Sequence, residues 1–342
     1  NKINYILTGH HEEDQIETIY MAEENNRSWV SKIGIRPINI IYNEDDTKIS
    51  LIRPMLNFSR NEILKYAKDK AIDYFDDPTN SDSKFLRNKI KFKIKSKIND
   101  PNFRLKYLNI SKFNSQKINK ISNDINNSFY SIVTLFKTND VCILNKELLA
   151  KMDYDFIFLF LKKILRECFS FDENLSSKYW KNLHLFLLSN NQGKSFILND
   201  YIYISKSKES IYIYKKKPTF NKINLNKCGN YFFRLGAISI ANSKLIVKIK
   251  NNEGISIPGR AIKHVYVDKW KNGDKCISDN NYSIKVSDIF INNKLSIFHK
   301  ENYPIVKYLD KIIWIPNLYR SNIFNLDNGS NEFFSFKWNV NL

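Results

Sequence analysis

Apolar residues in the first hundred positions fall in short runs that alternate with amphipathic segments. The pattern predicts a buried strand over residues 5–8, a helix over residues 12–24, and extended segments over residues 38–42 and 49–52. A second helix is predicted over residues 60–70, because its apolar positions share one face and a Ser-x-x-Glu capping box opens it. Strands alternating with helices are typical of an α/β fold. We therefore predict that residues 1–100 form part of a doubly wound α/β domain with a parallel sheet.

The rest of the chain changes character twice. Apolar spacings of three and four predict a mostly helical stretch from residue 101 to about residue 188, and two strands follow before residue 214. A basic, proline-containing linker near residue 218 predicts a boundary. Short β-type segments dominate beyond it, with one short helix. We therefore predict a mainly helical middle domain over residues 101–217 and a small β-rich α+β domain over residues 218–342.

The charge of the chain is strongly basic. Its 342 residues include 54 Lys or Arg and 35 Asp or Glu, a formal net charge of +19. Such an excess suggests a polyanionic partner, most simply nucleic acid. A compositional explanation competes with it, because the abundance of Lys, Asn, Ile, Phe and Tyr is the bias of an A+T-rich genome. With 43% hydrophobic residues the chain can build cores, which excludes wholesale disorder.

The sequence gives little support for a membrane protein or for a protein built around a metal site. No apolar run is long enough to cross a bilayer, and no signal peptide is visible. The four cysteines form no Cys-x-x-Cys pair, which argues against a zinc ribbon and a disulfide framework. We therefore expect no membrane association and a cytoplasmic location.

The strongest chemical signal is the segment GHHEEDQIET over residues 9–18, where a strand passes through a glycine turn into an acidic helix. Asp14 and Glu17 are three residues apart, so they share one helical face near the carboxyl end of that strand. Such a pair can hold a cationic amine or a magnesium ion, or it can merely offset the helix dipole. His10 has no second ligand at metal spacing, so we expect a polar site histidine and no protein metal centre.

These residues resemble the GHHxDDQxET motif of tRNA(Ile)-lysidine synthetases, members of the PP-loop ATP pyrophosphatase superfamily. Segments similar to the family's RPLL, SRxEI and EDPSNxDxxFxRNxIR motifs follow in order: RPML at 53–56, SRNEI at 59–63, DDPTNSD at 76–82 and FLRNKI at 85–90. A weaker resemblance to the family's C-terminal domain covers WKNGD at 270–274, KVSDIF at 285–290, PIV at 304–306 and IIWIP at 312–316. The resemblance implies a Rossmann-like PP-loop domain at the N-terminal end and a tRNA-binding domain at the C-terminal end.

The resemblance also implies a reaction. Family members use ATP to adenylate C2 of the wobble cytidine in the CAU anticodon of tRNA(Ile), and the side-chain amine of L-lysine then displaces AMP to form lysidine. By carry-over, Asp14 and Glu17 hold the lysine, His10 lines the same pocket, Arg87 reaches the ATP phosphates and Asn88 positions the loop or nucleotide. Catalytic roles thus fall on His10, Asp14, Glu17 and Arg87. ATP and Mg²⁺ are the implied cofactors, and a homodimer is implied by resemblance only.

Candidate tRNA contacts lie in two places. Residues 88–98 alternate polar and apolar side chains, which by periodicity predicts a strand, but the resemblance places a helix there and we adopt the helix. Lys89, Lys91 and Lys93 would then contact tRNA phosphates beside the site, although a solvated lysine face is an equal alternative for each of them. In the C-terminal domain the candidates are Arg260, Lys263 and Lys285.

One departure from the family limits these expectations. The family carries an SGGxDS-type phosphate loop after its first strand, and this sequence contains no two adjacent glycines. We expect an N-terminal PP-loop segment to be missing from the chain as given, and residues 1–342 alone to bind ATP poorly. Two alternatives therefore stay open: a non-catalytic tRNA- or RNA-binding remnant, and another PP-loop tRNA-modifying enzyme such as a thiolase, whose cytidine-modifying versions usually rely on Cys-x-x-Cys pairs.

Overall fold

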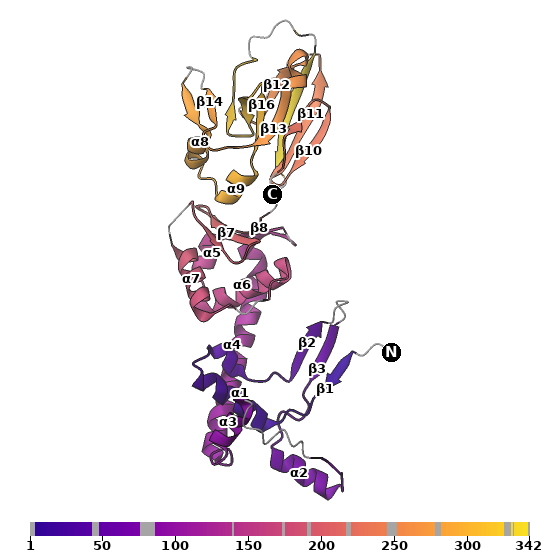
Figure 1. Cartoon of the computed structure of the whole chain (residues 1–342), viewed down its shortest axis with the longest axis vertical. Coiled ribbons are helices and arrows are strands. Elements are labelled where there is room, and N and C mark those ends of the chain that lie inside the picture. Colours follow the sequence, from indigo (N-terminus) through magenta and orange to yellow (C-terminus); the bar gives the residue numbers. More distant parts are fainter. Residues whose placement is uncertain are drawn as a thin grey trace. The chain divides into compact units, whose positions relative to one another are not determined.

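The structure is a computed structural model in which the chain separates into two compact units, Asn1–Asn126 and Asn127–Leu342 (Figure 1). We describe each unit by itself. The residues described are 4–42, 48–75, 86–138, 140–172, 175–189, 193–216, 220–244, 252–277, 282–324, 330 and 332–340. Within these ranges no helix is long and apolar enough to cross a membrane.

The first unit contains a three-stranded sheet in the order β1-β3-β2, formed by Tyr5–Leu7, Ile38–Tyr42 and Lys48–Ile52. β1 pairs with β3 in parallel, but β2 pairs with β3 antiparallel, so the predicted parallel sheet holds for one of the two pairs. The short connection over residues 43–47 explains the difference, because parallel neighbours need a crossover of about a dozen residues or more.

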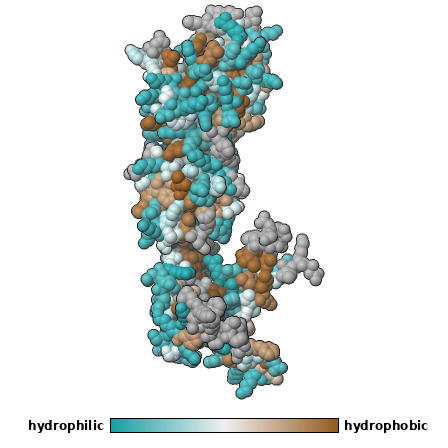
Figure 2. All heavy atoms as spheres, viewed as in Figure 1, coloured by the Kyte–Doolittle hydropathy of each residue, from teal (hydrophilic) through white to brown (hydrophobic). Residues whose placement is uncertain are grey.

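Strand β1 is not the buried strand that the sequence predicts. Tyr5 and Leu7 are each 67% exposed, and Ile38 and Ile40 of β2 are also exposed. Figure 2 shows apolar side chains gathered over this part of the first unit. Among the described residues no second layer covers these strands, which accounts for their exposure despite their apolar sequence.

The helices of the first unit build its core. Ile16 and Ile19 of α1 pack with Ile90 and Ile94 of α3 and with Tyr107 of α4. The helix expected from the resemblance over residues 88–98 is confirmed as far as Ile94, and turns follow over residues 95–99, so the periodicity prediction of a strand is wrong. Ile90 and Ile94, four residues apart, face the core, whereas Phe92 between them is 52% exposed. The helices are α1 (Glu12–Glu24), η1 (Trp29–Ile33), α2 (Arg60–Asp69), α3 (Leu86–Ile94) and α4 (Pro101–Ile132).

The middle part of the chain combines helices with a sheet. The predicted helical stretch contains helices over residues 154–169 and 177–188, with Ile157, Leu161 and Ile164 buried on the first and Trp180 and Leu183 on the second. The structure has three strands where two were predicted, namely β6, β7 and β8. The sequence also did not predict β4 and β5, which complete an antiparallel sheet of order β4-β5-β8-β7-β6. The elements are β4 (Val133–Lys137), β5 (Val141–Asn145), α5 (Lys146–Ala150), α6 (Tyr154–Phe169), α7 (Ser177–Leu188), β6 (Ser195–Ile197), β7 (Ile202–Lys206) and β8 (Ser210–Lys215).

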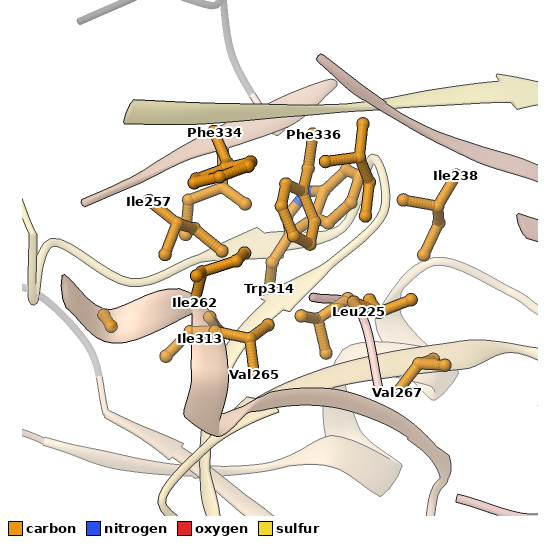
Figure 3. Close-up of a cluster of buried hydrophobic side chains, with 14 residues drawn as sticks. Leu225, Ile238, Ile257, Ile262, Val265, Val267, Ile313, Trp314, Phe334 and Phe336 are labelled. Carbon is orange, nitrogen blue, oxygen red and sulfur yellow. The ribbon is translucent and has the colours of Figure 1, made fainter. Parts of the chain in front are cut away.

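The C-terminal part is β-rich, as predicted. Its larger sheets have the orders β10-β11-β19-β12 and β18-β17-β16-β13-β9. Trp314 and Phe336 lie at the centre of a core that both sheets line (Figure 3). The elements are β9 (Ile223–Asn224), β10 (Gly229–Phe233), β11 (Gly236–Ser243), β12 (Gly254–Pro258), η3 (Gly259–His264), β13 (Val265–Lys269), β14 (Lys275–Ile277), β15 (Ser283–Lys285), α8 (Val286–Asn292), α9 (Ile297–Asn302), β16 (Pro304–Tyr308), β17 (Lys311–Ile315), β18 (Tyr319–Arg320) and β19 (Phe333–Val340).

The middle and C-terminal parts share one core within the second unit. Tyr212 of β8 stacks on Phe298 of α9, and Tyr214 of β8 packs tilted against the same ring, with ring centroids 5.4 and 4.9 Å apart. Arg234, from the β10–β11 turn, pairs with Asp140 at 2.6 Å, and its side chain is only 10% exposed. The packing is therefore continuous across residue 218, and the domain boundaries at residues 100 and 217 stay predictions.

Candidate functional site

The site begins where β1 ends and the chain turns into α1. The backbone N–H of Thr8 donates to the carbonyl of Ile52 at 3.0 Å, which continues the pairing with β3. His11 is the N-cap of α1, and its backbone N–H donates to Asp14 Oδ2 at 2.9 Å in a capping box. His10 Nδ1 lies 2.9 Å from the hydroxyl of Thr8. The cap thus fixes the Asp14 carboxylate at the end of the strand.

The structure brings three of the predicted site residues together. Arg87, at the start of α3, places Nη2 2.6 Å from Asp14 Oδ1 and Nε 3.3 Å from Glu17 Oε2. The two acidic side chains are 13% and 8% exposed, while Arg87 is 45% exposed. One guanidinium therefore bridges two nearly buried carboxylates. A cation is the ligand that such a pair requires, because adjacent buried carboxylates repel each other.

Burial shifts the ionisation of two groups here. Burial raises the pKa of Glu17, Asp14 adds to the increase, and Lys91 and Arg87 oppose it. Burial lowers the pKa of His10 below 6.5, assisted by Arg53 and Arg87 and opposed by Asp14. At neutral pH the imidazole of His10 is therefore mostly uncharged, and Glu17 is a stronger proton acceptor than an ordinary glutamate.

A second ion-pair network supports the first turn of α1. Arg104 of α4 donates to Glu13 Oε1 at 2.8 Å and also pairs with Glu12. The other oxygen of Glu13 accepts the backbone N–H of Arg60 at 2.8 Å and lies 3.0 Å from His11 Nδ1. The hydrogen bond to Glu13 raises the pKa of His11, although burial opposes it. Sequence reasoning missed this network, because the Arg104–Glu13 contact joins residues 91 positions apart.

Gln15 of the GHHEEDQIET segment has a positioning role that the sequence did not reveal. Its Nε2 donates to the hydroxyl of Ser111 on α4 at 2.7 Å and to the carbonyl of Ile33 at 3.2 Å. Its Oε1 accepts the backbone N–H of Ile35 at 2.5 Å. Gly34 lies directly against this amide. The buried Gln15 side chain thus fixes α1 to both η1 and α4.

The remaining candidates near the site differ in their surroundings. Asn88 is buried, Lys91 is half-buried and close enough to affect Glu17, and Lys89 is exposed. Lys93 is ion-paired with Glu24 and lies 5.8 Å from the ring centroid of Tyr20. The DDPTNSD segment and Phe85 lie outside the described residues.

The C-terminal candidates belong to the second unit. Arg260 and Lys263 are exposed on η3, and Lys285 is exposed at the N-cap of α8. Val286 and Phe290, which follow Lys285 in the KVSDIF segment, are fully buried and belong to the core. The two groups of candidate tRNA contacts therefore lie in different units.

Comparisons with known proteins agree with the geometry. Residues 1–98 match the PP-loop domain family. Three tRNA(Ile)-lysidine synthases are similar over nearly the whole chain: those of Bacillus licheniformis (23% identity, 97% of this chain, 71% of the relative), Pseudothermotoga lettingae (26%, 95%, 66%) and Persephonella marina (26%, 94%, 70%). The chain thus spans about two thirds of the length of these relatives.

A structural comparison adds a weaker likeness. The crystal structure titled "Crystal structure of TILS C-terminal domain" aligns with 35% of this chain and 97% of its own, at 19% identity and a TM-score of 0.33, which is too low to support a fold assignment. The similarity to known proteins rests instead on the PP-loop match and on relatives that align with more than nine tenths of the chain. Residues 1–98 thus match the PP-loop domain family, and nearly the whole chain is similar to tRNA(Ile)-lysidine synthases.

Proposed function

We propose that this chain catalyses the ATP-dependent ligation of lysine to C2 of the wobble cytidine in the CAU anticodon of tRNA(Ile), through an adenylated cytidine. The observation that carries the proposal is the Asp14–Glu17 pair, which is nearly buried and bridged by a single cation. Two nearly buried negative charges that already accept one cationic side chain fit the ammonium of lysine. The similarity to enzymes named tRNA(Ile)-lysidine synthase supplies the rest of the reaction.

The residues around the pair suggest how the amine becomes a nucleophile. The lysine ammonium is bound by Asp14 and Glu17, and it must lose a proton before its nitrogen can attack C2. Glu17 is suited to accept that proton, because burial raises the pKa of its carboxyl. His10 is mostly uncharged at neutral pH, so it lines the pocket without repelling the ammonium. The amine then forms the new bond to C2, and AMP leaves with the former C2 oxygen.

ATP enters as a substrate that supplies the adenylyl group. The C2 oxygen attacks the α-phosphorus and pyrophosphate leaves, so negative charge must be stabilised on phosphate oxygens. Arg87, beside the pair, carries a guanidinium that can bind phosphate bidentately, and we propose that the buried Asn88 positions the loop or the nucleotide.

Magnesium is the second cofactor that the resemblance implies. Among the described residues no group of three or more His, Cys, Asp or Glu side chains is arranged to hold a metal ion. The Asp14–Glu17 pair is bridged by a guanidinium instead. We propose that Mg²⁺ is carried by the ATP phosphates, since Mg²⁺ at such sites needs only one or two protein carboxylates, and no step of the reaction is assigned to it.

Binding of the tRNA is proposed for basic residues in both units. Lys89 and Lys91 follow Arg87 on α3, so they are placed to contact phosphates close to the modified base. Lys93 can join them only by leaving its pair with Glu24. The exposed cations of the second unit, Arg260, Lys263 and Lys285, are proposed to contact the tRNA backbone.

The test measures attachment of labelled lysine to a CAU-anticodon tRNA by this chain and by the chain extended through the coding sequence upstream of Asn1. A tRNA with another wobble base is the substrate control. In the active form, Asp14→Asn should raise the KM for lysine by about 10- to 100-fold, the loss of one charged hydrogen bond. Glu24→Gln on the same helix is the matched control. Tight tRNA binding by both forms without lysine transfer contradicts the proposal and favours a non-catalytic binder.

A further inference from the structure

The Asp14–Glu17 pair already holds a cation that belongs to the protein. We propose that Arg87 is an internal competitor of the substrate: its guanidinium occupies the carboxylate pair until lysine replaces it. The identity of the incoming ligand rests on the proposed function, whereas the occupancy by Arg87 follows from the contacts themselves.

The hydrogen bonds of Asp14 show why the two cations compete. Oδ1 accepts Arg87 Nη2 at 2.6 Å. Oδ2 accepts the backbone N–H of His11 at 2.9 Å and lies 3.5 Å from His11 Nε2. Glu17 Oε2 accepts a hydrogen bond from Arg87 Nε at 3.3 Å. An ammonium that bridges the two carboxylates must therefore take the positions that the guanidinium holds.

Arg87 is the partner that can leave. Its side chain is 45% exposed, so it can extend into solvent without unpacking the core. The helix that carries it stays in place, because Ile90 and Ile94 of α3 are buried against α1. The other donor to Asp14 is the N-cap backbone, which cannot move without opening the first turn of α1. The exchange also conserves charge, since one monovalent cation replaces another beside two buried carboxylates.

The competition links lysine binding to ATP binding. A guanidinium that pairs with phosphate oxygens cannot also bridge Asp14 and Glu17, so a nucleotide that draws Arg87 away frees the pair for lysine. By thermodynamic reciprocity, lysine then increases the affinity for nucleotide by the same factor. Arg87 thereby favours the complex that contains both substrates.

The experiment measures the dissociation constant of lysine by calorimetry for the full chain and four variants. Arg87→Gln should bind lysine about tenfold more tightly than wild type, a change of about 1.4 kcal/mol. Arg87→Lys keeps the competing charge and should stay near wild type. Lys93→Gln removes a cation from the same helix without touching the pair, and it is the matched control. Asp14→Asn should abolish the gain when combined with Arg87→Gln. Circular dichroism confirms that each variant is folded.

Two further measurements separate this inference from the proposed function. Binding of n-butylamine tests the pair with an ammonium that has no amino-acid group. If Arg87→Gln binds n-butylamine more tightly than wild type but binds no lysine, the competition stands and the lysine assignment fails. If wild type binds lysine and Arg87→Gln binds it equally or more weakly, the competition is overturned and the lysine site stands. If neither probe binds Arg87→Gln, both are overturned. The coupling to nucleotide is tested in the form extended upstream of Asn1, after calorimetry has shown that this form binds ATP. Failure of saturating ATP to tighten lysine binding in that form overturns the coupling.

Discussion

Glu13 offers a sharp test of how the site is supported, because it does not touch the Asp14–Glu17 pair but joins the first turn of α1 to other elements. Its carboxylate accepts from Arg104 of α4 and from the backbone N–H of Arg60 at the start of α2, each at 2.8 Å. The substitution Glu13→Gln keeps the shape of the side chain and removes its charge. We expect the helix to open locally more often, because Arg104 loses one of its two acidic partners.

The magnitude follows from the ionisation of Glu13. Burial alone would raise the pKa of its carboxyl, but hydrogen bonds from His11, Arg104 and the Arg60 backbone outweigh burial and lower the pKa to about 2. Relative to the ordinary value of 4.5, this lowering corresponds to about 3 kcal/mol. Solvent screening of the part-buried cluster reduces the effect, so we expect a loss of about 2 kcal/mol at pH 7.

The pH dependence has a definite sign. Because the pKa of Glu13 is lower in the folded state than in the unfolded state, its contribution is complete well above pH 4.5 and is lost as the pH falls towards 2. The difference between wild type and Glu13→Gln should therefore be largest at neutral pH. About half of it should be gone near pH 3.5.

Amide hydrogen exchange of the peptide that covers α1 measures this local stability. At pH 7 we expect exchange about 30-fold faster in Glu13→Gln than in wild type. Glu24→Gln, at the exposed end of the same helix, is the control and should have a much smaller effect. Equal acceleration by both variants, or a difference that persists unchanged at pH 3.5, would refute the argument from the Glu13 network.

Three further predictions concern other parts of the chain. Gly34→Ala should destabilise the first unit by at least about 2 kcal/mol in thermal unfolding, because Gly34 has φ +77° and its new Cβ would lie 2.5 Å from Gln15 Oε1. Gly193→Ala has a similar φ of +84° but open space, so it should cost less. Burial lowers the pKa of Lys206 to about 8, and the nearby Lys146 adds to the lowering. The unfolded chain keeps the lysine protonated up to about pH 10.5, so the free energy of unfolding should rise between pH 8 and 10.5 in wild type. This rise should be absent in Lys206→Met. Arg234→Gln should reduce the free energy of unfolding in urea by about 3 kcal/mol, since it removes the buried guanidinium that pairs with Asp140 at 2.6 Å; an unchanged midpoint contradicts this.

Several local features of the first unit could be predicted from the sequence alone. Ser59 and Glu62 form the capping box that the sequence indicates, with Glu62 Oε2 accepting the Ser59 backbone N–H at 2.7 Å. The spacing of Asp14 and Glu17 placed both carboxylates on one face of α1. The alternating segment around Ile90 misled the periodicity argument, because spacings of two and four coincide when every second residue is apolar.

Tertiary structure alone decided which groups meet. Arg87 reaches Asp14 across 73 positions, and Arg104 reaches Glu13 across 91. Periodicity specifies which face of a helix is buried, but the partner of each polar group depends on how α3 and α4 pack against α1. The sequence thus determined the acidic pair, while packing decided that the protein's own guanidinium bridges it, because two nearly buried carboxylates are stable together only with a cation between them.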